Sequence, residues 1–146
     1  MIFLMLTEYD IKTLKDYFAK HRDVAFAFLF GSQASGKASS LSDIDIAVYL
    51  YPENRHPVEY EEEIYYDVED QIWVDIENLI KKDIEMVVLN RVPSTIAASA
   101  IKGIPLAIND WGLYLDFMEV VTSEAEDFMT FYINEWQKRG SIEKRG

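Results

Sequence analysis

Two continuous apolar runs, residues 24–30 and 44–50, constrain the fold of this chain more than any other feature. Both runs are too short for a typical helix. Neither alternates apolar with polar residues, and this is typical of strands buried on both faces. The sequence therefore predicts an α/β (α+β) fold in which a small mixed β-sheet is flanked by helices.

Apolar spacing and end signals predict the other elements. Thr7 suits an N-cap, with Asp10 three residues later, so a first helix is expected at about residues 8–20. A short helical turn is expected after Gly31, and a third strand at 85–90. A short helix should then run from Pro93 to about Ile101, with Gly103 as its stop. A small fourth strand at 104–108 and helical spacing from about 112 to 139 complete the chain.

A long acidic helix is expected between the second and third strands. Pro57 is well placed to open it, and an apolar stripe continues to about Lys81. The charged run at 59–70 is most simply its solvated face.

Length and composition favour one compact domain. The 146 residues, 49% of them hydrophobic, suffice for one core, so we expect a single domain at 1–146, with its core at about 1–110 and a helical segment at about 112–139. The 14 basic and 26 acidic residues give a formal charge of −12, which repels phosphate backbones. Direct nucleic-acid binding is therefore not expected. The charge suits either simple solubility or a basic protein partner.

Cysteine is absent, so disulfides and thiolate metal sites are not expected. The apolar start, residues 1–6, lacks the basic flank and the length of a signal peptide, and no run approaches the roughly 18 apolar residues of a membrane span. We expect a soluble, cytoplasmic protein.

The end of the first apolar run suggests a phosphate-binding turn. Gly31 permits a tight turn and a close approach of phosphate to main-chain N–H groups. Ser32 adds a hydroxyl, and a following helical turn would direct its positive end at the anion.

Two aspartates at the second run suggest a metal site. Because successive strand residues point to opposite faces, Asp43 and Asp45 are expected on the same side. Two close carboxylates repel unless a cation lies between them, and Mg²⁺ prefers such oxygens together with substrate phosphates. The simpler alternative is that Ser42 and Asp43 cap a turn and Asp45 is a satisfied polar residue.

A third acid should come from another strand. Glu85 is the candidate, provided that its strand pairs beside residues 44–50 with its side chain on the same face; it could then bind metal and help to deprotonate an attacking hydroxyl. Asp83, just before that strand, is the rival. Ordinary surface charge is the alternative for both.

Two other motifs fail on single residues. The segment from Gly31 to Lys37 approaches a P-loop, but Ala38 stands where a Ser or Thr hydroxyl is required. A calcium loop opening at Asp43 would place Ala47 and Val48 at positions that need an oxygen ligand and a glycine.

Residues 31–45 resemble the signature of minimal nucleotidyltransferases (MNT), a branch of the polymerase-beta-like superfamily. The pattern is glycine-serine, a spacer of small residues with a glycine, then serine-aspartate-x-aspartate, and the matching residues are Gly31, Ser32, Ala34, Gly36, Ser42, Asp43 and Asp45. Residues 84–90 resemble the third-acid strand, with Glu85 on an acidic position and the register leaving room for Asp83. Gly103 and the segment 114–117 resemble features downstream of that strand. Two departures are Ser35, where many relatives have arginine, and Val88, where an acid is often found.

The resemblance implies transfer of AMP from ATP with Mg²⁺. Small MNT proteins resemble antitoxins that bind a HEPN ribonuclease toxin and adenylylate one of its tyrosines, so a hetero-oligomer with that partner is expected. Catalysis and metal binding would then fall to Asp43, Asp45 and Glu85, and nucleotide binding to Gly31, Ser32, Lys37 and Ser42. The alternatives are an antitoxin that acts by steric binding alone and a small-molecule nucleotidyltransferase.

The C-terminal helical segment is rich in aromatic residues, namely Tyr114, Phe117, Phe128, Phe131, Tyr132 and Trp136. Most are expected to pack in the core, and an exposed subset would suit a partner surface together with the acidic run at 59–70. His21 and His56 lie outside the motif and are expected to be incidental.

Overall fold

The computed structural model describes residues 6–35, 44–52 and 65–145. In chain order the elements are α1 (Glu8–Lys20), β1 (Val24–Phe30), α2 (Ser32–Ser35), β2 (Asp45–Leu50), α3 (Glu69–Ile80), β3 (Glu85–Val88), the 3₁₀ turn η1 (Leu89–Arg91), α4 (Ser94–Ala100), β4 (Ile104–Ile108) and α5 (Trp111–Arg145). The predicted first helix, first strand and fourth strand have the bounds observed.

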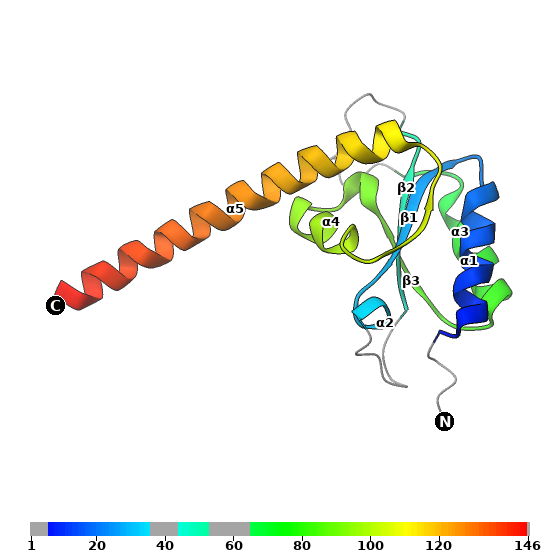
Figure 1. Cartoon of the computed structure of the whole chain (residues 1–146), viewed down its shortest axis with the longest axis horizontal. Helices are drawn as coiled ribbons and strands as arrows, with labels where there is room; N and C mark the ends of the chain where they lie inside the picture. Colours follow the sequence, from blue (N-terminus) through cyan, green and yellow to red (C-terminus); the bar gives the residue numbers. More distant parts are fainter. Residues whose placement is uncertain (1–5, 36–43, 53–64, 146) are drawn as a thin grey trace.

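The strands form one mixed sheet in the order β3-β2-β1-β4. Strand β1 is antiparallel to both β2 and β4, whereas β2 and β3 are parallel. Helices α1 and α3 lie on one side of this sheet, and α4 and the start of α5 lie on the other (Figure 1). The predicted fold, a small mixed sheet flanked by helices with a C-terminal helix, is confirmed.

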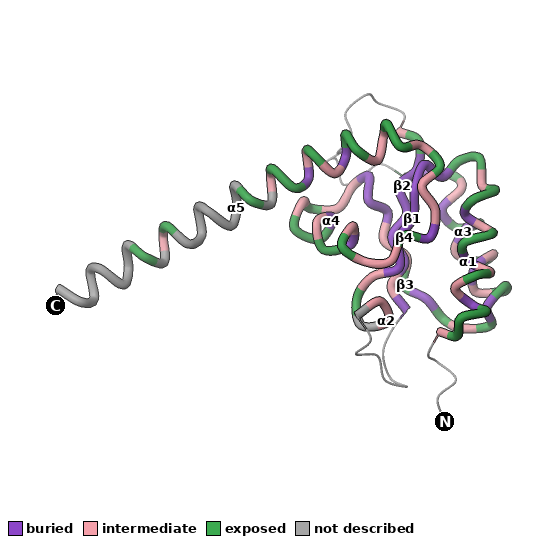
Figure 2. The backbone as a smooth tube through the Cα atoms, viewed as in Figure 1, coloured by how far each residue is buried: buried purple, intermediate pink, exposed green. Residues whose placement is uncertain are grey.

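Burial on both faces explains the two apolar runs. The core beneath α1 and α3 contains Leu29 and Ile46, and the core beneath α4 and α5 contains Phe28 and Ala47. A register shift near Ala25 places two consecutive residues of β1 on the same side, as a β-bulge does. The central strands are therefore the most buried part of the chain (Figure 2).

Helix α1 begins with the predicted cap. The Thr7 hydroxyl accepts a hydrogen bond from the Asp10 N–H (3.1 Å), and the Asp10 carboxylate accepts one from the Thr7 N–H (3.0 Å). This reciprocal capping box satisfies two N–H groups that a helix start leaves open. At the other end of α1, the Asn109 amide donates to the carbonyls of Phe18 and of Val24, the first residue of β1, and so ties the end of α1 to the sheet.

The prediction of one helix from Pro57 to Lys81 was wrong at its start. Residues 65–68 are not helical, and α3 begins at Glu69; residues 53–64 lie outside the described part of the chain. The reason is that Glu69 is 4% exposed and accepts hydrogen bonds from the Tyr66 N–H and from both Arg91 guanidinium nitrogens (2.6 Å each). The Glu69 carboxylate raises the pKa of Arg91. Glu69 thus forms a buried ion pair, whereas Asp67 and Asp70 in the same run are exposed, as expected for a solvated face.

The predicted third strand is also shorter than expected. Strand β3 ends at Val88, and Asn90 lies in η1 with its side chain fully buried. The Asn90 amide accepts from the Leu50 N–H and donates to the Leu50 carbonyl (2.9 Å each). Its side chain satisfies the backbone groups that a longer strand would have paired.

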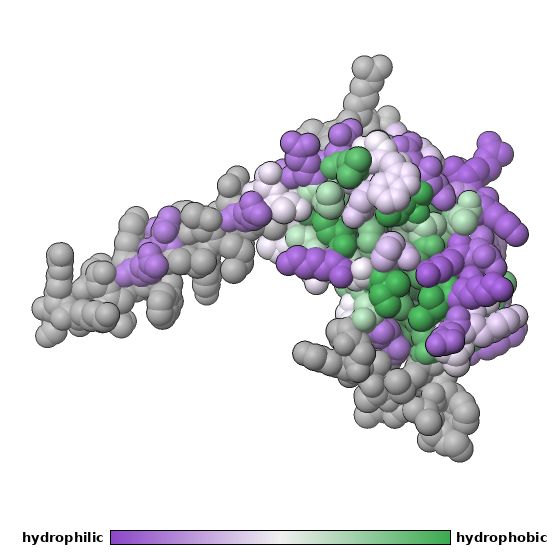
Figure 3. All heavy atoms as spheres, viewed as in Figure 1, coloured by the Kyte–Doolittle hydropathy of each residue, from purple (hydrophilic) through white to green (hydrophobic). Residues whose placement is uncertain are grey.

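Helix α5 extends in both directions beyond the predicted 112–139. It has 35 residues, roughly 52 Å at 1.5 Å per residue. Phe117 and Val121 are buried against the sheet, and the distal part of the helix projects from the body (Figure 1). The side chains described there are hydrophilic (Figure 3). Phe117 confirms the expected core packing; the side chains of the more distal aromatics lie outside the description. No helix in the described ranges has the length and apolar content to cross a membrane.

Gly103 is required by packing. A Cβ at this position would lie 2.1 Å from the Leu29 carbonyl oxygen, whereas a Cβ at Gly112 would meet only Asp110 Oδ1 at 3.4 Å. We expect Gly103→Ala to destabilise the fold by roughly 2 kcal/mol or more, because backbone must move. Gly112→Ala, near the start of α5, should be neutral or stabilising by up to about 1 kcal/mol. Urea denaturation of both variants tests this, and equal stabilities would contradict the packing argument.

The α1 cap should make the free energy of unfolding depend on pH in the acid range. Burial by itself would raise the pKa of Asp10, but the Lys82 ammonium and the Thr7 N–H and hydroxyl lower it below its usual value. A lowered pKa contributes stability that is complete above the unfolded pKa of about 4 and is lost as pH falls through the folded value. We expect Asp10→Asn to cost roughly 1 kcal/mol at pH 7 and progressively less below pH ~4. Denaturation midpoints measured from pH 7 to pH 2.5 check this; a constant difference would refute it.

Candidate functional site

The predicted site lies at the end of the sheet where β1 ends and β2 and β3 begin. In the ladder between β1 and β2, Phe30 pairs with Asp45. In the ladder between β2 and β3, Asp45 pairs with Glu85. Asp45 therefore lies between the last residue of β1, which leads into the Gly31 turn, and Glu85, the candidate third acid.

Asp45 and Glu85 share one face of the sheet. Their neighbours Ile46 and Met86 pack toward α1 and α3, so both acids face the α4 and α5 side. Paired residues of neighbouring strands lie about 4.8 Å apart, within reach of one bound ion. Asp45 is half-buried and Glu85 is exposed. Glu85 thus meets its condition, because its strand pairs beside β2 and its side chain is on the same face as Asp45. The alternative third acid, Asp83, is exposed and precedes the paired residues.

Gly31 touches the Asp45 carboxylate. Gly31 has φ of +73°, and a Cβ built there would lie 2.4 Å from Asp45 Oδ2. Only glycine satisfies both constraints, the left-handed backbone and the close approach. The Gly31 carbonyl accepts from the Ala34 N–H (3.2 Å), which closes the predicted helical turn, α2. The predicted phosphate turn and the carboxylate predicted to bind metal are therefore adjacent in space.

Other members of the predicted site cannot be placed. Asp43, Lys37 and Ser42 lie outside the described residues, and only the backbone of Ser32, the first residue of α2, is described. Within the described ranges no three His, Asp or Glu side chains form a metal cluster. The roles of all these residues remain predictions.

The described donors nevertheless fit a magnesium ion. Two carboxylates on paired strands share a face, and the absence of a Cβ at Gly31 leaves room for Asp45 Oδ2. Carboxylate oxygens are the ligands that Mg²⁺ prefers, and Asp43 would add a third from two residues upstream.

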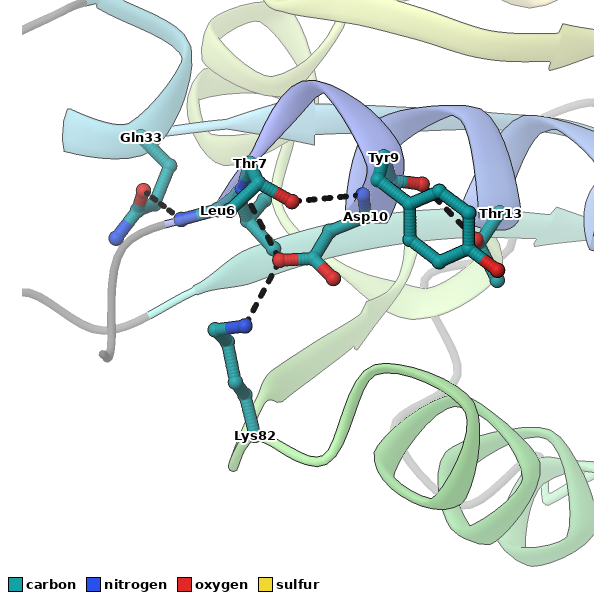
Figure 4. Close-up of polar contacts among 7 residues, drawn as sticks. All are labelled: Leu6, Thr7, Tyr9, Asp10, Thr13, Gln33 and Lys82. Atoms are coloured by element: carbon teal, nitrogen blue, oxygen red, sulfur yellow. Dashed lines mark hydrogen bonds and ion pairs between the residues drawn. The ribbon is translucent and has the colours of Figure 1, made fainter.

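Sequence reasoning missed Gln33. Its side-chain oxygen accepts a hydrogen bond from the Leu6 N–H (3.3 Å), which joins α2 to the chain just before α1 (Figure 4). The only sequence signal was an amide among the small residues of the turn, and this signal does not identify a partner 27 residues away.

Comparison with protein families identifies the class. The family model Polbeta, described as polymerase beta, nucleotidyltransferase, matches residues 12–111, which include β1, β2 and β3. The chain therefore belongs to the polymerase-beta nucleotidyltransferase family, and the resemblance seen in residues 31–45 is confirmed.

Solved structures share this fold over almost the whole chain. A chain of a toxin–antitoxin crystal structure with AMP-PNP is 18% identical, with 94% of this chain and 95% of that chain covered and a TM-score of 0.52. A toxin–antitoxin MntA-HpeT mutant with two Asp-to-Glu substitutions is 17% identical at the same coverage, with a TM-score of 0.51. A protein from Shewanella oneidensis is 15% identical over 93% of this chain and 95% of its own, with a TM-score of 0.50. No curated protein matches the sequence.

The contact between Gly31 and Asp45 makes a direct prediction. Gly31→Ala should displace the Asp45 carboxylate and weaken binding of Mg²⁺ with AMP-PNP at least tenfold, because an added Cβ would overlap Oδ2. Isothermal titration calorimetry measures this, with thermal denaturation as the control for folding. Unchanged affinity in a folded Gly31→Ala variant would show that Asp45 does not take part in nucleotide binding.

Proposed function

We propose that this protein is an antitoxin nucleotidyltransferase that binds a HEPN ribonuclease toxin and transfers AMP from ATP to a toxin tyrosine. The observation that carries the proposal is the register that sets Asp45 beside Glu85 and against the Gly31 turn. This arrangement combines a phosphate-binding turn with carboxylates for a metal, as transfer from a nucleoside triphosphate requires.

The comparisons support the proposal in two ways. The family match defines a nucleotidyltransferase domain, and the chain covers nearly all of a toxin–antitoxin chain whose crystal structure includes AMP-PNP, an ATP analogue. ATP as co-substrate follows from that likeness by analogy.

Each site residue has a proposed role. Asp43, Asp45 and Glu85 would bind Mg²⁺, which when bound neutralises phosphate charge during transfer. Gly31 and Ser32 would orient the phosphates with main-chain N–H groups and a hydroxyl, and Ser42 and Lys37 would add contacts from the segment that precedes β2. Glu85 is exposed, so its carboxylate can accept the proton of an incoming hydroxyl.

The proposed reaction is a single displacement. The tyrosine oxygen forms a bond to the α-phosphorus, the bond between that phosphorus and the bridging oxygen breaks, and pyrophosphate leaves. The tyrosine proton passes to Glu85. Most of the rate acceleration would come from positioning and charge stabilisation, since the protein forms no covalent bond to the substrate.

The position of Glu85 favours a macromolecular acceptor. Strand β3 is at one edge of the sheet, and Glu85 is its exposed first residue, so a side chain on another protein can approach it from solvent. The net charge of −12 would attract a basic partner and steer its approach.

The function is tested with the protein encoded by the adjacent gene, which this proposal expects to be a HEPN ribonuclease. With [α-³²P]ATP and Mg²⁺ we expect the wild-type protein to label the toxin, and Asp43→Ala with Asp45→Ala to abolish labelling. Glu85→Gln should slow labelling about 10²–10⁴-fold, the usual contribution of a general base. Asp83→Asn is the matched control and should leave the rate within about twofold. No labelling of the toxin by the wild-type protein would refute the proposal.

A cell-survival assay separates catalysis from steric neutralisation. Cells that express the toxin should survive with the wild-type protein and die with the Asp43→Ala, Asp45→Ala variant, provided that co-purification shows the variant still binds toxin. Survival with that variant would favour the purely steric antitoxin.

A further inference from the structure

The two halves of the site lie on segments with few backbone restraints of their own. Helix α2 has four residues, and β3 is a four-residue edge strand that begins at Glu85. Short helices and strand ends fray unless other contacts restrain them. The described residues supply such contacts through the start of α1 (Figure 4).

The first contact is between Gln33 and Leu6. A main-chain N–H can only donate, so the Gln33 atom that accepts from Leu6 must be Oε1, and this assigns the orientation of the amide. Nε2 is then buried with no hydrogen-bond partner in the described part of the chain. An unsatisfied buried donor destabilises the fold, so a side chain in this state calls for an explanation beyond stability.

The second contact is between Asp10 and Lys82. Lys82 Nζ lies 2.8 Å from Asp10 Oδ2, and the two side chains are only 14% and 10% exposed. The same Oδ2 accepts from the Thr7 N–H, the residue after Leu6. Lys82 is three residues before Glu85, so a charged hydrogen bond joins the α1 cap to the entrance of β3.

We propose that this N-terminal network, consisting of Leu6, Thr7, Asp10, Gln33 and Lys82, couples the phosphate turn to the third-acid strand, with Gln33 and Lys82 as positioning residues. The chain of contacts runs from α2 through the α1 cap to the entrance of β3, between segments that no strand ladder joins. Movement of either half is transmitted to the other. Its consequence for nucleotide binding rests on the function proposed above; the coupling itself does not.

Amide hydrogen exchange tests the coupling directly in the full-length protein. The reporters are the Ala34 N–H, which donates to the Gly31 carbonyl, and the Glu85 N–H, which donates to the Ile44 carbonyl. We expect Lys82→Met to speed exchange at Ala34 roughly fivefold, and Gln33→Leu to speed exchange at Glu85 by a similar factor, about what the loss of one net hydrogen bond gives. Each variant acts on a reporter that its side chain does not contact.

Two matched controls separate coupling from general loss of stability. Tyr17→Phe removes the hydrogen bond of α1 to Asp75 on α3, far along the helix from the cap, and Lys81→Met removes the same charge one residue away on an exposed position. Both should leave the two reporters within about twofold of wild type. Purely local effects, with Lys82→Met altering only Glu85 and Gln33→Leu only Ala34, would overturn the proposal.

Affinity for Mg²⁺ with AMP-PNP provides the link to the site. If the wild-type protein binds, Gln33→Leu and Lys82→Met should each raise the Kd roughly fivefold at a temperature where all variants are folded, and the controls should not. Equal affinities would show that Gln33 and Lys82 are not positioning residues and would overturn that assignment. Absence of binding by the wild-type protein would count against the proposed function, and the exchange experiment would still decide the coupling.

Discussion

The register of three strands around Asp45 is the constraint on which the rest of the structure depends. Asp45 pairs with Phe30 on β1 and with Glu85 on β3, and a slip of one residue in either ladder would turn an acid to the opposite face. The two faces of β2 differ in side-chain size, with Ile46 and Val48 in one core and Ala47 and Tyr49 in the other, so a slip would leave both cores badly packed. Packing of apolar side chains several residues away therefore determines where the carboxylates lie.

Burial of both faces of the central strands was predictable from the sequence. Continuous apolar runs predicted the central strands, and Gly31 at the end of one run predicted a turn, which the structure places against Asp45. Sequence patterns suffice for these elements because the apolar run and the strand, or the glycine and the turn, are the same or adjacent residues. The pairing of Glu85 with Asp45 was only conditional, since no local pattern determines which strands become neighbours.

The errors occurred where one side chain satisfies a distant partner. An acidic run preceded by a proline looks like one solvated helix, but Glu69 is buried because Arg91, 22 residues later, neutralises it. A strand pattern through Asn90 ends early because that amide binds the backbone of Leu50. Gln33 was overlooked for the same reason. A buried polar group is stable only with its partner, and the partner is a property of the fold rather than of the local sequence.

These long-range polar contacts also explain how a small sheet can present an acid on an exposed edge. Strand β2 has two neighbours, but β3 has one, so Glu85 is restrained by a single ladder and by the segment that leads into it. That segment is anchored twice, because Lys82 binds Asp10 on α1 and the Ile84 N–H donates to Glu77 on α3. Both anchors lie on helices that pack on the face of the sheet opposite to the acids. The restraints that position Glu85 therefore act from the face of the sheet opposite to the two acids.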